Sequence, residues 1–317
     1  MHTHAVVLPG QIPIARPDAV PQVRERTLAK ARTLLEALPF MREHRGKTIV
    51  IECSGAMTDG APISRPFAND IALLQHAGIH PLIVHGDGPR VTQLSARLGL
   101  ETAFVGGYRV TDANTLEVTE MVLAGKLNTE LVGVLLAGGV SAVGLSGVDG
   151  RSLVARRRAD PDLGFVGEIE QVNVELAQVL MDRGFVPVVA AIGADGSGQV
   201  YNVNADAVSA ELAAGLCAEK LVYMTDVPGV IGSDGDLLTE IGLRDALDLL
   251  ARGTAIDGGV IPKLRAAVRA LEAGVPRVHL LDGRVEHALV LELFTPEGIG
   301  TMITLDAHAP SPAGGPG

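Results

Sequence analysis

Short, uninterrupted apolar segments that alternate with glycine-bearing turns and helical patterns constrain the fold of this chain more than any other feature. A segment that is apolar at every position forms a strand covered on both faces, so the alternation predicts an α/β fold with a mainly parallel sheet between helices. Ligands of such sheets bind at the carboxyl ends of the strands, where the turns lie. The predicted strands are 48–51, 81–84, 142–145, 186–191 and 221–224, and helical patterns cover about 67–77, 114–137, 173–183, 206–216, 242–251 and 259–273.

The ends of the chain have a different composition. Four prolines interrupt the first 21 residues, and three prolines and three glycines occupy the last eleven, so we expect a disordered leader over 1–22 and a disordered tail over 305–317. Residues 23–46 carry apolar side chains at helical spacing, and Pro39 is expected to end that helix. Its apolar stripe must be buried on its own domain or on another subunit, and the pattern leaves both open.

Composition excludes several functions. The 26 Lys and Arg against 37 Asp and Glu give a net charge of −11, and aromatic residues are 3% of the chain, which disfavours nucleic acid as a partner. Residues 131–148 reach the length of a membrane span, but five glycines and two serines interrupt them. Cys53 and Cys217 lack the spacing of a disulfide framework or a metal site. We therefore expect a cytoplasmic protein without a metal site of its own.

Glycine-bearing turns follow three of the strands, at 54–55, 86–88 and 144–150. A turn without a Cβ lets backbone N–H groups approach an anion, and a helix N-terminus behind it attracts negative charge. The turns thus fit phosphate binding, although tight strand-to-helix turns need glycine in any case. None of them matches GxxxxGK[ST] or GxGxxG.

Polar residues in apolar surroundings are the candidates for ligand binding. Arg109 can hold a carboxylate bidentately or form a surface ion pair. Asn202, Asn204 and Asp206 alternate with apolar residues and share a face, where they can bind ligand groups or cap the next helix. Lys263 stands in the first turn of a helix, where a lysine indicates a nearby anionic ligand or is simply exposed.

Several segments, in this order, resemble the amino-acid kinase family, and within it the members that phosphorylate N-acetyl-L-glutamate. The similarity spans about residues 23–304. The segments that carry it are GYRVTD (107–112), EMVLAGKLN (120–128), AVGLSGVDG (142–150), DLGFVGEIEQVN (162–173), YNVNAD (201–206), AEKLVYMTDVPGV (218–230), GGVIPK (258–263) and DGRVEHALVLELFTPEGIGTMI (282–303).

The resemblance implies a three-layer α/β/α sandwich around a mainly parallel sheet, the amino-acid kinase fold. An acyl-substrate lobe would span 47–195 and an ATP-binding lobe 196–304. The implied reaction moves the γ-phosphoryl group of ATP, with Mg²⁺ on its phosphates, to the γ-carboxylate of N-acetyl-L-glutamate, giving an acyl phosphate in arginine biosynthesis.

The resemblance also assigns roles to residues. The residues implied to bind the acyl substrate are Gly86, Gly88, Arg109, Asn202 and Asn204. Lys263 and Asp206 are implied to be catalytic. The residues implied to bind the nucleotide are Thr225, Asp226, Gly229 and Lys263.

The N-terminal helix and the C-terminal segment resemble those of arginine-inhibited members. There the helix over 23–46 interlaces dimers into a hexamer, a trimer of dimers, and arginine is a feedback effector. The residues implied for arginine are His287, Glu297, Gly298 and Gly300.

Two positions depart from the family. Glu52 stands where the family has a lysine, in a first loop that is one residue shorter, and Asp87 replaces a loop glycine. Each change introduces negative charge where phosphates are expected, and one misplaced unit charge about 4 Å away is worth roughly 4 kcal/mol. Three hypotheses remain: an acetylglutamate kinase in which Lys47 or Arg90 replaces the missing lysine, a kinase for a different carboxylate, and a catalytically impaired paralogue that binds ligand or regulates.

Overall fold

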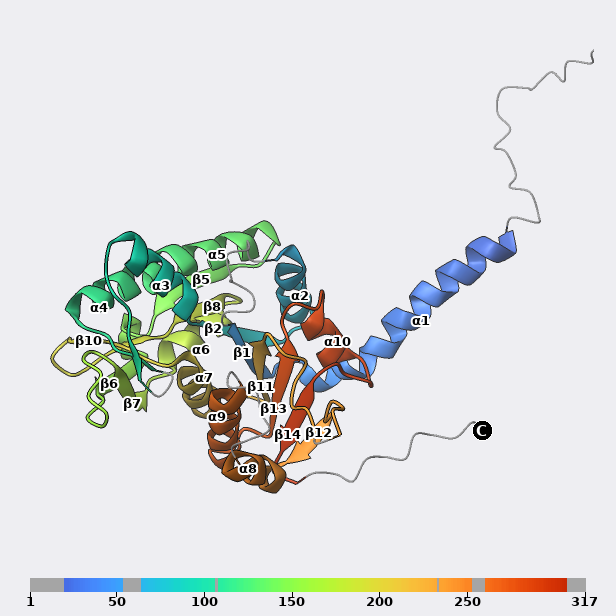
Figure 1. The fold of residues 1–317 in the computed structure, drawn as a ribbon. Coiled ribbons are helices and arrows are strands. Elements are labelled where there is room, and N and C mark those ends of the chain that lie inside the picture. The colour runs from blue at the N-terminus through green and yellow to red at the C-terminus, as the bar shows by residue number, and fades with distance from the viewer. Residues whose placement is uncertain (1–19, 54–63, 106–107, 233, 253–259, 307–317) are drawn as a thin grey trace, which may run out of the picture.

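Eight strands of the described chain form one sheet that runs through the body of the molecule (Figure 1). The computed structural model describes residues 20–53, 64–105, 108–232, 234–252 and 260–306. The strand order is β12-β14-β13-β11-β1-β2-β8-β5. All neighbours pair in parallel except β13 and β14, so the predicted mainly parallel sheet is confirmed. The bounds are β1 Thr48–Cys53, β2 His80–His85, β5 Ala142–Ser146, β8 Val186–Ala190, β11 Lys220–Thr225, β12 Glu240–Gly242, β13 Arg277–Asp282 and β14 Thr301–Thr304.

Helices cover both faces of this sheet, which gives the expected three layers. Alternate residues of β1 point to opposite sides: Ile49 and Ile51 belong to one apolar core and Val50 to the other. The first core lies under α2 (Arg65–His76), α5 (Asn128–Ala137) and α10 (Ala288–Phe294). The second lies under α6 (Glu175–Asp182), α7 (Ala205–Gly215), α8 (Leu243–Arg252) and α9 (Val260–Glu272). Glu52 shares the Val50 side and therefore faces the layer that contains α7 and α9.

A second, four-stranded sheet lies beside the carboxyl ends of β2 and β8. Its order is β10-β9-β6-β7, with β6 Leu153–Arg157, β7 Gly167–Val172, β9 Ile192–Ala194 and β10 Val200–Asn202. The short strands β3 (Phe104–Val105) and β4 (Tyr108–Arg109) form a separate ribbon. The expected boundary between residues 195 and 196 falls in the turn that joins the paired strands β9 and β10.

Three helical elements replace the single helix expected over 114–137. They are α4 (Ala113–Glu120), the π-helix η2 (Met121–Leu127) and α5, which follow one another without a break. The helix α3 (Gly88–Arg97) follows β2, and η3 (Asp149–Arg151) follows β5. A π-helical turn is rare and often lies at a functional site.

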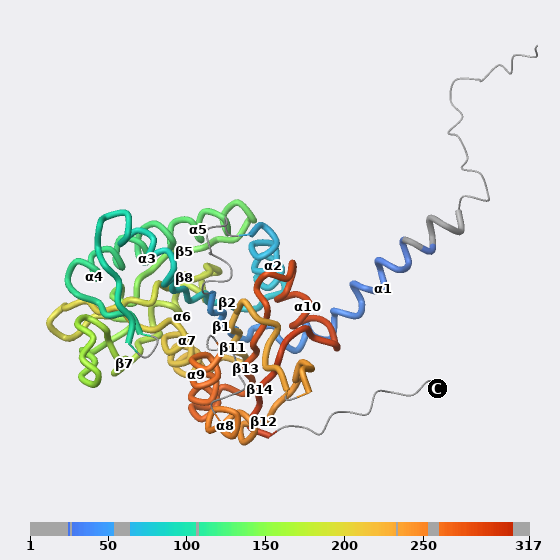
Figure 2. The backbone as a smooth tube through the Cα atoms, viewed as in Figure 1, coloured from blue at the N-terminus to red at the C-terminus, as the bar shows by residue number. Residues whose placement is uncertain are grey.

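The N-terminal helix continues through Pro39, where it was expected to end. Helix α1 spans Val20–His44. A proline inside a helix removes one backbone hydrogen bond. Tertiary contacts stabilise the turn after Pro39, because Phe40 and Met41 pack on the core and His44 is buried. The preceding turns project from the body (Figure 2) and expose Leu34 and Leu35 by 71% and 64%.

The expected leader and tail lie almost entirely outside the described residues, which begin at residue 20 and end at 306. Within the described ranges, no helix combines the length and apolarity that crossing a bilayer requires.

Candidate active site

A cavity of about 210 Å³ lies at the carboxyl ends of β1 and β2, between the large sheet and β4 and β10. All the residues predicted for substrate binding line it, although they come from distant parts of the sequence: Gly86, Gly88, Arg109, Asn202 and Asn204. Asp206 lines it as well, together with both departures from the family pattern, Glu52 and Asp87. The cavity therefore gathers the candidate acyl site at the edge of the sheet where the turns predicted it.

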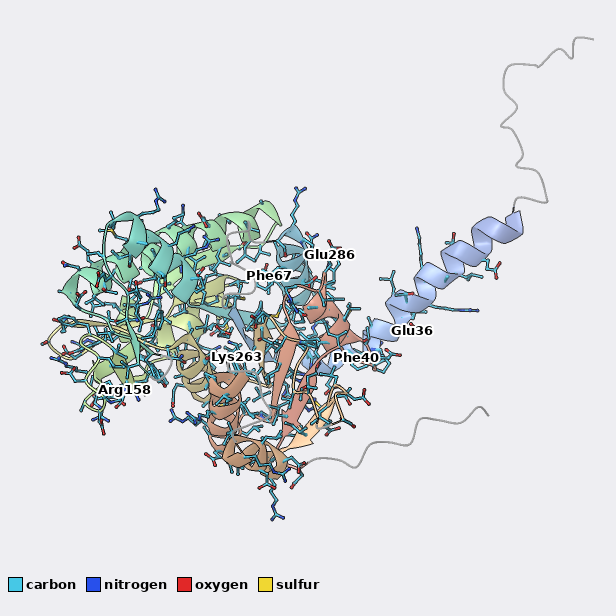
Figure 3. All side chains as sticks on the ribbon, in the orientation of Figure 1. Glu36, Phe40, Phe67, Arg158, Lys263 and Glu286 are labelled. Atoms are coloured by element: carbon cyan, nitrogen blue, oxygen red, sulfur yellow. The ribbon has the colours of Figure 1, made fainter. Side chains whose placement is uncertain are left out.

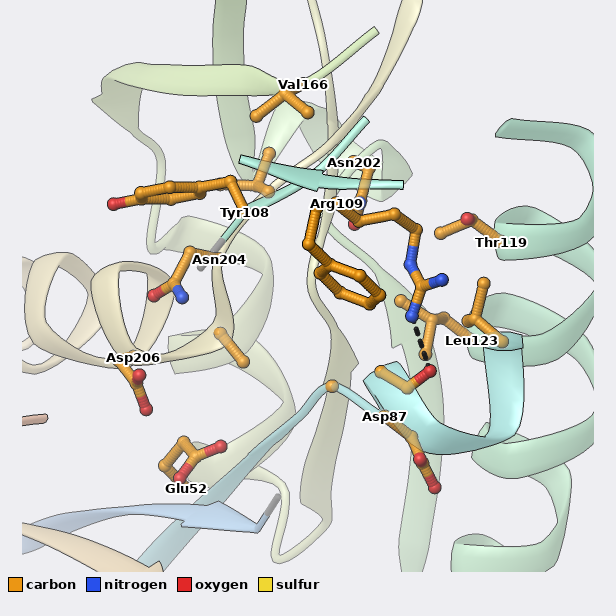
Figure 4. A pocket seen from close by; sticks show the side chains of 16 residues that line it. Glu52, Asp87, Tyr108, Arg109, Thr119, Leu123, Val166, Asn202, Asn204 and Asp206 are labelled. Atoms are coloured by element: carbon orange, nitrogen blue, oxygen red, sulfur yellow. Dashed lines mark hydrogen bonds between the residues drawn. The ribbon is translucent and has the colours of Figure 1, made fainter. Parts of the chain in front are cut away.

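Arg109 forms one end of the cavity (Figure 4). Its side chain stacks over the Phe104 ring, and its Nη2 donates to the Gly88 carbonyl oxygen at 2.6 Å and to Thr92 Oγ1 at 2.8 Å. Arg109 is only 7% exposed, and its Nη1 has no hydrogen-bond partner among the described residues. Because a buried guanidinium N–H without an acceptor is costly, this end of the cavity is suited to a carboxylate.

The start of helix α7 positions two polar side chains that line the cavity. Asn204 is its N-cap, and its Oδ1 accepts from the Ala207 N–H at 2.9 Å, so capping and a position in the cavity coexist. Asp206 follows in the first turn, and the Tyr223 hydroxyl on β11 donates to its carbonyl oxygen at 3.0 Å. The tyrosine thus fixes the start of α7 against the sheet.

The opposite end of the cavity is a buried cluster of three charges. The Lys263 ammonium donates to Glu52 Oε2 at 2.7 Å and to Asp206 Oδ1 at 2.6 Å. Glu52 is fully buried, and Lys263 and Asp206 are 6% and 9% exposed. Burial alone would lower the pKa of Lys263, but the two carboxylates outweigh burial and raise it, so the lysine stays charged. We refer to these residues as the charge triad.

Asp87 has a local partner. It is the N-cap of α3, and its Oδ1 accepts from the Arg90 N–H at 2.8 Å. The Arg90 guanidinium lies 3.1 Å from Asp87 Oδ2 and also pairs with Glu130. The positive charge of Arg90 therefore compensates the negative charge of Asp87.

Lys47, the other candidate replacement for the family lysine, precedes β1 and so lies at the opposite end of that strand from Glu52. Its Nζ is 3.8 Å from Glu219 Oε2, and its side chain is 53% exposed. The hypothesis that Lys47 supplies the missing charge is wrong for this structure.

Of the four residues predicted for nucleotide, Lys263 belongs to the charge triad, and the other three lie outside the cavity, at the end of β11 next to β1 and in the segment that follows it. Thr225 ends β11, and Asp226 follows it. Gly229 adopts φ 147°, and a Cβ there would lie 2.5 Å from Thr301 Oγ1. Glycine is therefore required in this turn. The glycines at 258 and 259 are outside the described residues.

A second cavity, of about 690 Å³, contains three of the four residues predicted for arginine: Glu297, Gly298 and Gly300. His287 is not among its lining residues, because its ring pairs with Asp70 at 2.6 Å between Nδ1 and Oδ1, at the start of α10. The C-terminal end of α1, through Glu43, also lines this cavity, which agrees with the effector position beside the N-terminal helix that the resemblance implies.

Sequence reasoning missed a buried chain of polar groups in the second cavity. Lys220 Nζ lies 3.3 Å from His279 Nε2, and His279 Nδ1 lies 2.6 Å from Glu292 Oε1. Burial is the main cause that lowers the pKa of Lys220 to about 8. The available signal was a lysine and a histidine within otherwise apolar strands.

A family profile and several known proteins match this chain. A profile described as the amino acid kinase family matches residues 47–282. A protein of Symbiobacterium thermophilum named acetylglutamate kinase is 47% identical over 290 residues, which is 88% of this chain and 99% of that protein.

Among solved structures, N-acetylglutamate synthase from Neisseria gonorrhoeae, complexed with coenzyme A and N-acetyl-glutamate, matches with a TM-score of 0.78 and 30% identity over 88% of this chain. The same synthase complexed with coenzyme A and L-arginine matches with a TM-score of 0.75 and 28% identity over 87% of this chain. The chain covers 64% and 66% of these two synthase chains.

The charge triad predicts unequal costs for two substitutions. Lys263→Met would leave two buried carboxylates without their ammonium and is expected to lower the free energy of unfolding by about 3–5 kcal/mol. Glu52→Gln leaves one ammonium facing one carboxylate, and we expect a cost of about 1–2 kcal/mol. Urea unfolding of both variants measures the difference, and equal costs would show that the triad is not electrostatically coupled.

Proposed function

The chain belongs to the amino acid kinase family, and we propose that it transfers the γ-phosphoryl group of ATP to the γ-carboxylate of N-acetyl-L-glutamate. The observation that carries this proposal is Arg109: a buried guanidinium with an N–H directed at no acceptor among the described residues, in a cavity that Asn202 also lines. The α-carboxylate of an acyl amino acid supplies the missing acceptor. The name of the relative that matches over 99% of its own length supports the same substrate.

ATP would bind beside this cavity, on the lobe that we place at 196–304, with the acyl substrate on the lobe at 47–195. Thr225, Asp226 and Gly229 would contact the nucleotide, and Lys263 would face its phosphates from the first turn of α9. Within the described ranges, no three His, Cys, Asp or Glu side chains form a metal cluster. Mg²⁺ would therefore be held mainly by the phosphates, whose charge it neutralises during transfer.

Trapping of the acyl phosphate with hydroxylamine tests this function. The purified chain is incubated with ATP, Mg²⁺ and N-acetyl-L-glutamate, and we expect hydroxamate to form. Arg109→Ala should lower kcat/KM by about 10²-fold, since it removes a charged hydrogen bond to the substrate. Exposed Arg151→Ala is the matched control and should leave the rate unchanged. Absence of hydroxamate at every substrate concentration would contradict the proposal.

The charge triad favours a second candidate, a paralogue that binds ligand without efficient transfer to a carboxylate. Lys263 is engaged by two carboxylates, where the family pattern has a lysine at the position of Glu52. The Glu52→Lys, Asp87→Gly double variant distinguishes the two candidates in the same trapping experiment. Hydroxamate from the double variant but not from the natural chain would support the paralogue.

We further propose that the second cavity binds arginine. Glu43, Glu240 and Glu297 can face a guanidinium there, and Lys220 and Arg277 can face a carboxylate. The complex of the structurally similar synthase with L-arginine supports the choice of ligand.

Glu297→Gln should weaken L-arginine binding by about tenfold, the effect of one charged hydrogen bond. Isothermal titration calorimetry measures the affinity. Glu286→Gln, at an exposed position that does not line this cavity (Figure 3), is the matched control. No heat of binding with the natural chain would rule the effector out.

We also propose that α1 packs against another copy of the chain in a hexamer. Leu28, Leu34 and Leu35 are more than half exposed on the projecting part of α1, which carries Glu36, whereas Phe40 lies where the helix reaches the body (Figure 3). Exposed leucines of this kind mark a surface that is buried against another protein chain.

Light scattering tests the oligomer. We expect six times the mass of one chain for the natural protein and a lower mass for Leu34→Asp, Leu35→Asp. Thr33→Asp, which adds charge to the same exposed helix without removing a leucine, is the control. A monomeric natural chain would overturn the proposal.

A further inference from the structure

A buried asparagine lies inside the continuous helical run formed by α4, η2 and α5. Asn128 follows η2 directly and is the first residue of α5. Asparagine is unfavourable inside helices, and a buried carboxamide is costly unless its donors are used. Asn128 is not among the residues that line the active-site cavity. Its contacts must therefore explain why the helix contains it.

The carboxamide of Asn128 connects three strands of the large sheet. Its Nδ2 donates to the Val188 carbonyl oxygen of β8 at 2.9 Å and to the Leu145 carbonyl oxygen of β5 at 3.2 Å. It also lies 3.0 Å from Nε2 of His85, the last residue of β2. A Cβ on Gly144 would lie 1.9 Å from Asn128 Oδ1, so β5 can accommodate the carboxamide only because this residue is glycine.

These contacts fix the proton on the His85 ring. Two backbone carbonyls accept from Asn128 Nδ2, so this atom is the amide nitrogen, and Nε2 of His85 must accept as well. Burial lowers the pKa of His85 to about 3, so the ring is neutral and its one proton is on Nδ1. Nδ1 has no hydrogen-bond partner among the described residues. Asn128 therefore imposes the tautomer.

His85 leads directly into the glycine turn at 86–88. Its carbonyl oxygen accepts from the Ala191 N–H at 3.1 Å, so both its backbone and its ring are anchored. At the other end of the turn, the Gly88 carbonyl oxygen accepts from Arg109 Nη2 at 2.6 Å. A shift of His85 would therefore move the turn and, with it, the acceptor that orients the Arg109 guanidinium.

A second, more exposed link joins α5 to the same turn. Glu130 pairs with Arg90, and Arg90 Nε lies 3.1 Å from Asp87 Oδ2 within the turn. The π-helix η2 lies immediately before Asn128, and its i→i+5 turns hold one residue more than α-helical turns. The π-helix thus shifts which side chains α5 presents to the turn at 86–88.

We propose that Asn128 is a positioning residue for phosphoryl transfer: it holds His85 in one tautomer and one orientation, and His85 fixes the turn at 86–88. This inference rests on the proposed function for the reaction itself. Backbone N–H groups of a turn stabilise developing charge best when they are preorganised. A displacement of about 1 Å at such a site costs about 10²-fold in rate.

A double-mutant cycle in the hydroxamate assay with N-acetyl-L-glutamate tests the role. Asn128→Ala and His85→Leu should each lower kcat by about 10²-fold. KM should rise by less than about fivefold, because Arg109 keeps its own donors. The double variant should be no slower than either single variant, since all three lose the same contact. Two unrelated packing defects would multiply their effects instead.

Conservative and matched substitutions complete the cycle. His85→Leu leaves Asn128 its two carbonyl acceptors, and this variant guards against a failure of Asn128→Ala to fold. His85→Gln keeps an acceptor near the position of Nε2 and should recover kcat to within about tenfold of the natural chain. Asn114→Ala, at an exposed position of α4 in the same helical run, is the control and should change neither kcat nor KM.

Solid-state NMR of the chain with ¹⁵N-labelled histidine tests the tautomer without turnover. We expect a protonated Nδ1 and an unprotonated Nε2 for His85 at neutral pH, assigned by the loss of these signals in His85→Gln. In Asn128→Ala the ring should give a mixture of both tautomers. A protonated Nε2 in the natural chain would overturn the inference.

The outcomes separate this inference from the proposed function. Hydroxamate from the natural chain with an unchanged kcat in Asn128→Ala would overturn the positioning role and leave the proposed function standing. A multiplied loss in the double variant would do the same. No hydroxamate from the natural chain at any substrate concentration would overturn the proposed function and the positioning role with it, whichever tautomer His85 adopts.

Discussion

The Lys263 ammonium between the carboxylates of Glu52 and Asp206 is the interaction on which this active site depends. It joins the central strand β1 to the first turns of α7 and α9, elements from three separate parts of the chain. Buried charges are tolerated when they are paired, so both carboxylates depend on the Lys263 ammonium and the ammonium depends on them. The same pairing places the carboxylates of Glu52 and Asp206 together at one end of the cavity.

The sheet and the convergence of the acyl-site residues were predictable from the sequence. The sheet follows from a local rule, that apolar strands with glycine turns place their carboxyl ends at one edge. The convergence of Arg109, Asn202 and Asp206 at that edge was implied by the family resemblance. The pairing of Lys263 with Glu52 was not predictable in this way. Glu52 was noted as a change of charge in the first loop, but it lies 211 positions from Lys263, and only the packing of α9 against the sheet brings them together.

Other differences between expectation and structure have similar causes. The local rule for proline predicts an end of α1 at Pro39, but contacts of Phe40 and Met41 with the core hold the following turn in helical form. His287 was grouped with Glu297 because the family resemblance implied both for arginine. Its pairing with Asp70 on α2 instead places it at the start of α10, outside the second cavity. In each case a contact distant in sequence decided the outcome.

One ammonium shared by two carboxylates also makes the three positions epistatic. Contacting residues in one ionic network do not have additive effects, so the tolerance of any one position to substitution depends on what occupies the other two. A neutral residue at position 52 would make the loss of Lys263 milder, and a lysine there would give Asp206 two cations to satisfy. The identity of residue 52 therefore determines which residues are tolerated at positions 206 and 263. A comparison of relatives that considers one of these positions at a time will misjudge the effect of a substitution at any of the three.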